Sequence, residues 1–441
     1  MFSVLKKIFG GEAPPPHASQ SARHDAPPPD SEDTPFLRRE AIFDRSNRLA
    51  GHLFHLPQST PLAADDKARQ RLLDENLLAT LNASPESWNA NLAFIPLSSS
   101  SLDLPGLDRL KAANVVLLLQ LADDAEADIV CAAIEGLRER GFLTGVFRQP
   151  KHPAFARVIR LVDYAAIDIS ANDAMTARDF SAAIRTGVRG HPVRVLACNI
   201  DTADEHRFCQ QWYFDHFHGK FATSPPAASS PTAGDPDRAQ LMNLLRLVQG
   251  DAETAEIAAA MKLDPLLSFR VLRYLNSPAL GLSHRIDSLE QALIILGRQR
   301  LTRWLAVLLF SVRNSQIGDW LTVENALTRG RLMEVLGEQT MPGQSRDPLF
   351  LTGIFSCLDA LLRRPLTDIL DDMLLAEDIR LALLQHDGPY APLLAVAKAG
   401  EAFDQAGMKK TALAAGIDPA SLNRALLAAT AWAAEVAEYW E

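Results

Sequence analysis

The sequence predicts an α/β half followed by an all-α half. In the first half, short apolar runs alternate with helical patterns up to about residue 225. After residue 238 these runs disappear, and apolar residues recur at the i, i+3, i+4 and i+7 positions of amphipathic helices. A stretch rich in proline, alanine and serine separates the two patterns at 224–237. The 441 residues also exceed one ordinary core, so two or three domains are expected.

Six runs in the first half have the composition of buried β-strands. They are AIFD (41–44), LAFIPL (92–97), NVVLLLQL (114–121), FLTGVF (142–147), YAAIDI (164–169) and VRVLAC (193–198). Helical spacing between them, as at 125–140 with Gly141 as the C-terminal stop, predicts strand–helix units. Strands that are apolar throughout indicate a parallel sheet buried on both faces. Periodicity alone leaves open whether this sheet is doubly wound or closed into a (β/α) barrel.

The second half carries helix signals at its joints. Asp264 can cap a helix whose first residue is Pro265, which has no N–H to leave unpaired. The sequence NSP at 276–278 ends that helix. Ser288 and Gln291 have the spacing of a capping box that opens the next one. The second half is therefore predicted to be helical throughout.

Composition limits the classes of function. With 47% hydrophobic and 22% charged residues the chain is typical of a soluble globular protein. Its net charge of −10 argues against a nucleic-acid partner. No apolar run reaches the roughly 20 residues of a membrane helix, and the N-terminus lacks a signal-peptide cleavage site. The four cysteines form no C-x-x-C pair, which favours free thiols and a cytoplasmic location.

Two histidine-containing features could suggest metal sites. The dipeptide His386-Asp387 resembles a phosphohydrolase motif, but the only other histidine after residue 218 is His284. With glycine and proline following, the dipeptide is interpreted as a helix end. The other feature is a set of four barrel-half histidines, His52, His55, His216 and His218. The first two would face opposite sides of a strand, and the last two could share a face without an evident partner acid. No metal and no cofactor is expected.

The region 264–301 resembles the core of the HDOD family. That family has a D-P-x-L helix, an N-S-x-x-[FL]-G turn, an I-x-S/T-[IL]-x-x-A helix start and a following L-G. The motif positions here include Asp264, Pro265, Asn276, Ser277, Gly281 and Gly297. The resemblance implies an HD-like helical fold without metal ligands that acts as a regulatory interaction module.

The first half resembles the EAL domains that recur in front of HDOD domains. RREAIFDRSNRLAGHLFHL at 38–56 is similar to the family's first strand, and WYFDHFHGKFATSP at 212–225 to its G-F-D-x-x-Q-G-x-x-F-x-x-P element. The resemblance implies a (β/α) barrel of the TIM type that hydrolyses cyclic di-GMP with metal-bound water. We divide the chain into a flexible tether (1–35), an EAL-like barrel (36–225), a linker (226–237) and an HDOD domain (238–441).

In this family frame the catalytic ligand positions carry other side chains. The positions that have lost their ligands are Leu53, Pro96, Leu118, Phe147, Arg148 and Ala166. Two acids survive, Asp168 and Asp201. Hydrocarbon side chains cannot ligate a cation, and an arginine would repel it. The sequence therefore predicts a degenerate barrel that is not an enzyme.

The resulting hypothesis is a non-catalytic bacterial signalling protein that acts through protein–protein interactions. Other signalling proteins are the expected partners, and a homodimer is compatible with the resemblance. Binding of cyclic di-GMP is not expected. Two alternatives stay open: a receptor that binds cyclic di-GMP without hydrolysing it, and a residual phosphodiesterase.

Overall fold

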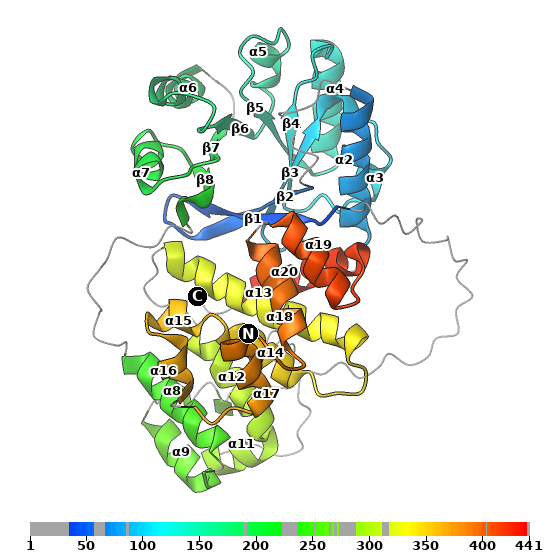
Figure 1. Cartoon of the computed structure of the whole chain (residues 1–441). Helices are drawn as coiled ribbons and strands as arrows, with labels where there is room; N and C mark the ends of the chain where they lie inside the picture. The colour runs from blue at the N-terminus through cyan, green and yellow to red at the C-terminus, as the bar shows by residue number, and fades with distance from the viewer. Residues whose placement is uncertain are drawn as a thin grey trace.

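The fold is an eight-stranded barrel followed by a helical half, seen as the upper and lower parts of Figure 1. The computed structural model describes residues 35–56, 67–84, 88–187, 192–222, 236–250, 252–263, 267–268, 271–272, 288–310, 317–371, 373–402 and 404–438. The predicted fold class, a TIM-type barrel followed by an all-helical domain, is confirmed. No helix in these ranges combines the length and hydropathy needed to cross a bilayer.

The strands close in the order β1 to β8, so the sheet has no free edge. Their bounds are β1 Arg38–Asp44, β2 Leu49–His55, β3 Leu92–Ser98, β4 Val115–Gln120, β5 Leu143–Phe147, β6 Tyr164–Asp168, β7 Arg194–Cys198 and β8 His216–His218. Strand β1 runs antiparallel to both of its neighbours, β2 and β8, whereas every other pair is parallel. Seven strands therefore direct their carboxyl ends to one rim, and β1 begins at that rim.

Helices pack outside the barrel, as strand–helix alternation predicts. They are α2 Lys67–Asn82, α3 Gly106–Arg109, α4 Ala127–Glu139, α5 Phe155–Val158, α6 Ala174–Gly187 and α7 Ala203–Gln211, with 3₁₀ turns at Ser99–Ser101 and Lys220–Ala222. Gly141 adopts φ +92° two residues after α4, which suits a residue without Cβ. The interior of the barrel is filled by alternate strand residues such as Ile42, Phe94, Leu118 and Tyr164.

The described residues of the second half form helices and the turns between them, and none of them is in a strand. Its helices are α8 Pro236–Gln249, α9 Thr254–Lys262, α11 Leu289–Leu296, α12 Arg298–Leu309, α13 Ile317–Thr340, α14 Asp347–Phe355, α15 Leu358–Leu362, α16 Leu366–Asp371, α17 Glu377–Arg380, a π-helical turn Leu381–Gln385, α18 Ala391–Glu401, α19 Gln405–Ala414 and α20 Pro419–Glu438. Trp304 on α12 is 2% exposed and lies in the hydrophobic core of the helical half. His386 ends the π-helical turn in a left-handed conformation, so the HD dipeptide is a helix end, as predicted.

The two halves share structure at the start of β1. Phe36 belongs to the hydrophobic core of the helical half, whereas the next residue, Leu37, belongs to the core of the barrel. The backbone N–H of Leu37 donates to Oδ1 of Asn423 on α20 at 2.8 Å, and Nδ2 of Asn423 donates to the carbonyl of Pro35 at 3.1 Å. In return, Leu427 of α20 packs into the barrel core. The halves are therefore docked through α20.

Candidate functional site

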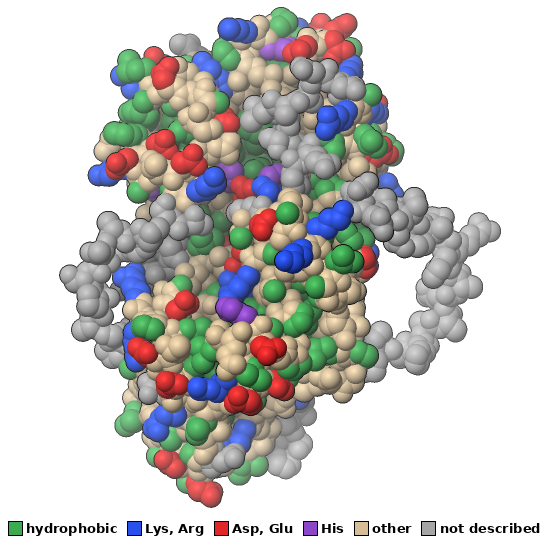
Figure 2. Space-filling model, viewed as in Figure 1, with side chains coloured by type: hydrophobic (Ala, Val, Ile, Leu, Met, Phe, Trp, Pro, Cys, Tyr) green, Lys and Arg blue, Asp and Glu red, His purple; other side chains and the backbone are tan. Residues whose placement is uncertain are grey.

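The candidate site is a cavity of about 880 Å³ between the barrel rim and the helical half. Barrel residues at the carboxyl ends of the strands form one wall, and α13, α18 and α20 form the other. The carboxyl rim is where (β/α) barrels place their active sites, because the loops there converge. Figure 2 shows basic, acidic and histidine side chains gathered where the two halves meet.

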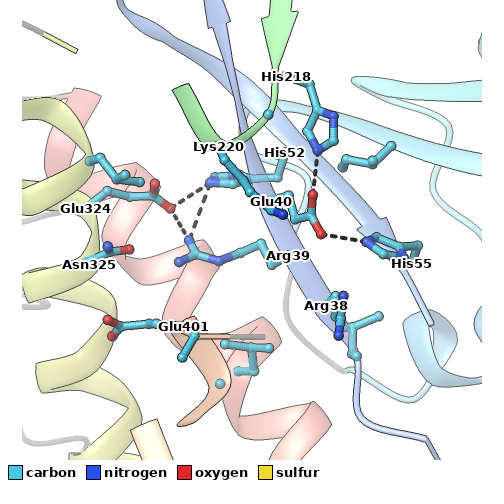
Figure 3. A pocket seen from close by; sticks show the side chains of 18 of the residues that line it. Arg38, Arg39, Glu40, His52, His55, His218, Lys220, Glu324, Asn325 and Glu401 are labelled. Atoms are coloured by element: carbon cyan, nitrogen blue, oxygen red, sulfur yellow. Dashed lines mark hydrogen bonds and ion pairs between the residues drawn. The ribbon is translucent and has the colours of Figure 1, made fainter. Parts of the chain in front are cut away.

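Glu40 lies at the centre of a polar cluster on the barrel side (Figure 3). Nε2 of His55 is 2.9 Å from its Oε1, and Nε2 of His218 is 2.5 Å from its Oε2. Burial would raise the pKa of the Glu40 carboxyl, but the hydrogen bonds and charges of the two imidazoles outweigh burial and hold it well below its usual range. Glu40 therefore stays ionised at neutral pH.

Glu324 of α13 forms a second cluster that joins the two halves (Figure 3). Its carboxylate makes an ion pair with Arg39 of β1 and lies 2.6 Å from Nε2 of His52 on β2. Glu324 is 5% exposed, and burial alone would raise the pKa of its carboxyl. The charge of Arg39 and the contact with His52 outweigh burial and lower this pKa to about 2. We call Arg39, His52 and Glu324 the interdomain cluster.

Strand alternation explains why the two clusters face different ways. Glu40 pairs in register with Leu53, and both share the inward-facing parity of Ile42. Arg39 pairs in register with Phe54, one position along, and its side chain turns to the helical half. His52 and His55 likewise contact different carboxylates, in line with the prediction that they face opposite sides of β2.

The structure brings together most of the positions at which the family frame places catalytic ligands. The cavity is lined by Leu53, Pro96, Phe147, Asp168 and Asp201. Leu118 and Ala166 instead lie inside the barrel among core residues and do not line the cavity. Arg148 also lies off the cavity wall, and its guanidinium donates to Oδ1 of Asn172 at 3.1 Å.

Asp168 is held at the rim by neighbouring polar groups. Nδ2 of Asn199 donates to its Oδ2 at 2.8 Å, and the hydroxyl of Ser170 donates to its Oδ1 at 2.7 Å. Asp201 opens the turn before α7, where its backbone N–H donates to Glu205 at 2.9 Å. These are ordinary helix-capping and turn contacts.

Several residues of the cavity wall were not predicted from the sequence. Gln120, two positions after Leu118, reaches the cavity at the end of β4, and Cys198 does so at the end of β7. Glu40 was also missed, although its alternation with Ile42 could have placed it on the inner face. Glu324 carried no usable signal, because it lies 272 residues from its partner His52.

The donor set does not fit the two-cation centre that the EAL family uses. Such a centre needs several carboxylate or amide oxygens converging within a few ångströms. Within the described ranges, no group of three or more histidine, cysteine, aspartate or glutamate side chains is arranged to hold a metal ion.

Of the six HDOD motif residues named from the sequence, Gly297 is the one in the described ranges. It joins α11 to α12 with φ +76°, a conformation that suits glycine. Ser288 caps α11 by accepting from the backbone N–H of Gln291 at 3.5 Å, which is the N-cap half of the predicted capping box. Asp264, Pro265, Asn276, Ser277 and Gly281 fall outside the described residues.

The buried His216 predicts acid sensitivity. It packs against Phe94 and Tyr164 inside the barrel, and its Nδ1 has no hydrogen-bond partner among the described groups. Burial lowers its pKa from 6.5 to about 4. The unfolded chain therefore binds the proton first, so the free energy of unfolding should fall as pH drops from 6.5 towards 4, by about 2–3 kcal/mol from this residue.

Denaturant titrations at pH 7 and pH 4.5 measure this effect. The His216→Leu variant should lose less stability than the wild type over that interval, because leucine has no proton to gain. His206, whose pKa burial also lowers to about 4, is unchanged in both proteins and cancels from the comparison. Equal losses in the two proteins would contradict the prediction.

Comparison with known proteins defines the class of protein. The HDOD domain family model matches residues 237–363, so the helical half contains an HDOD domain. A closed (β/α) barrel precedes it, so the chain joins a barrel to an HDOD domain in the order that the sequence predicted.

Similarity to particular proteins extends over most of the chain. The sequence is 28% identical over 375 residues to the cyclic di-GMP phosphodiesterase CdgJ of Vibrio cholerae serotype O1, covering 84% of each chain. It is 23% identical over 372 residues to YuxH of Bacillus subtilis, covering 82% of this chain and 90% of YuxH. A solved structure of the Bacillus subtilis YkuI protein, with an EAL domain, in complex with cyclic di-GMP and calcium is 14% identical with a TM-score of 0.34, covering 62% of this chain and 74% of that one.

These relatives correct one prediction of the sequence analysis. The prediction that the chain is not an enzyme is wrong, because the curated relative that matches 84% of both chains is named a phosphodiesterase. The prediction rested on single ligand positions read from a loose alignment of the middle strands. What stands is the similarity, over most of the chain, to a protein named a cyclic di-GMP phosphodiesterase.

Proposed function

We propose that this chain is a regulatory protein of cyclic di-GMP signalling that acts through contacts with other signalling proteins. The observation that carries the proposal is a group of exposed apolar side chains in and beside two adjacent helices of the HDOD domain. Leu263, which follows α9, is 78% exposed, and Ile294 and Ile295 on α11 are 71% and 39% exposed. Exposed apolar groups rimmed by charges, here Lys262 and Glu290, are typical of interaction surfaces.

The barrel side of the molecule supports the same role. At the rim, Arg39 and His52 are engaged by a carboxylate of the helical half, and His55 and His218 by Glu40. Charged groups that are satisfied within the protein hold two domains in one arrangement. Such an arrangement suits a protein whose state is recognised by partners, and it is compatible with hydrolysis at the rim.

The second candidate function is phosphodiester hydrolysis at the cavity. The name of the Vibrio cholerae relative favours it. Among this chain's own residues, Asp168 and Asp201 are acids that line the cavity and belong to the surviving family positions. The polar cluster of Glu40 with His55 and His218 lies on the same wall and could hold or move a proton.

The interaction role is tested with two matched surface variants of the full chain. Ile294→Glu should abolish capture of the protein's native signalling partners, because a charge replaces an exposed apolar contact. Leu72→Glu, at a position on α2 that is 57% exposed, should leave capture unchanged. Cross-linking followed by mass spectrometry of the captured proteins makes the comparison. Loss of the same partners in both variants, or in neither, would contradict the proposal.

Hydrolysis is tested separately on the purified full chain. Incubation with cyclic di-GMP and Mn²⁺ or Mg²⁺, followed by chromatography, detects the linear dinucleotide. The second candidate expects turnover that falls at least a hundredfold in Asp168→Asn. Calorimetric binding of cyclic di-GMP without any linear product would instead identify a receptor. If neither turnover nor binding is detected, the interaction role remains as the proposed function.

A further inference from the structure

We propose that the helical half gates the barrel cavity and that the interdomain cluster holds the gate closed. The inference goes beyond the proposed function, because it concerns the access of any solute to the rim, whether or not hydrolysis occurs there. It starts from the composition of the cavity, whose walls belong to different domains. Leu53 and Asp168 lie on the barrel wall, whereas Leu321 and Thr328 of α13 lie opposite. The separation of the two domains therefore sets the width of the cavity.

The two halves are joined by attachments of different chemistry. At the start of β1, Phe36 is buried in the helical core and Leu37 donates its backbone N–H to Asn423. This attachment uses apolar burial and backbone hydrogen bonding, so it is lost only when the chain unfolds locally. It provides a fixed point about which the halves can move.

The interdomain cluster is the attachment that can be released. Its ion pair holds the two halves together only while both partners are present, because either charge left alone at a buried site is costly. Once water reaches Arg39, His52 and Glu324, each is solvated, so breaking this particular contact costs little. The interdomain cluster, which lies at the cavity, thus has two states. In the closed state its side chains are buried and paired, and in the open state they are hydrated and apart.

A native cysteine reports on the state of this gate. Cys198 lines the cavity and is 4% exposed, and burial holds the pKa of its thiol well above its usual range. Opening would expose the thiol and also allow the reactive thiolate to form. Cys131 and Cys209 are buried in the barrel away from the cavity and report on unfolding of the barrel.

The experiment measures alkylation of the full chain by N-ethylmaleimide, with each cysteine followed by peptide mass spectrometry. In Glu324→Gln, which removes the charge and keeps the shape, Cys198 should react at least ten times faster than in the wild type. Cys131 and Cys209 should keep their wild-type rates. If this variant is insoluble, Arg39→Lys, which removes the guanidinium that contacts both Glu324 and His52, should give the same selective increase.

Glu334→Gln is the matched control. Glu334 lies on the same helix, is 6% exposed and pairs with Arg303, but both partners belong to the helical half. Its replacement should leave the alkylation rate of Cys198 unchanged. An unchanged rate for Cys198 in Glu324→Gln would overturn the proposal. A rise matched by Cys131, or by the Glu334→Gln control, would overturn it as well, because general loosening would then explain the labelling.

Discussion

Gly353→Ala is expected to lower the free energy of unfolding by about 3 kcal/mol. Gly353 of α14 crosses Gly330 of α13 so closely that an added Cβ would lie 2.5 Å from the Cα and 2.6 Å from the backbone nitrogen of Gly330. These are backbone atoms, so the methyl group can be accommodated only by moving one helix. Because α13 carries Glu324, the shift should also disturb the interdomain cluster. Equilibrium denaturation of the full chain measures the change.

The control for this prediction is Gly136→Ala. Gly136 lies inside α4, where an added Cβ meets nothing within 4 Å. Alanine is the better helix former, so this variant should gain about 0.5–1 kcal/mol. A Gly353→Ala variant as stable as the wild type would show that the α13–α14 crossing is looser than described.

Glu324→Leu is expected to cost about 3–5 kcal/mol, because it leaves Arg39 with its charge buried and its carboxylate partner gone. Arg39→Met should cost a similar amount, because it leaves the Glu324 carboxylate buried without its cationic partner. The double variant should recover most of the loss, since hydrocarbon then replaces both charges at once. Denaturant unfolding of the wild type, both single variants and the double variant gives the interaction energy directly. Losses that simply add would show that the two side chains are independent.

The barrel was largely predictable because its strands are short, apolar and separated by helical patterns. The ranges 92–97 and 164–169, for example, became β3 and β6 with shifts of one residue. The antiparallel direction of β1 was not predictable from periodicity, since a strand has the same alternation in either direction. The closure of the sheet came from the family resemblance and not from the pattern.

The site was only partly predictable. Leu53 and Phe147, which lie at or near the carboxyl ends of β2 and β5, line the cavity, because the turns that follow a strand show where it stops. Leu118 lies in the barrel core, and the β4 residue that lines the cavity is Gln120. A continuous run of apolar residues gives no signal in the sequence for which of them reaches the end of the strand. Glu324 lies in the region where the resemblance was weakest, and only the folded chain brings it to Arg39.

The docking of Phe36 and Leu37 against α20 has a consequence for the order of folding during synthesis. The first strand of the barrel emerges from the ribosome early, yet its anchor, Asn423, is made almost 390 residues later. Until then the start of β1 lacks its hydrogen bonds to Asn423. The seam of the nascent barrel, where β1 pairs with β2 and β8, is therefore incompletely stabilised. Contacts so distant in sequence form slowly. A ribosome-bound chain that ends before α20 should therefore expose this seam to proteases and chaperones, and release of the C-terminus should close it.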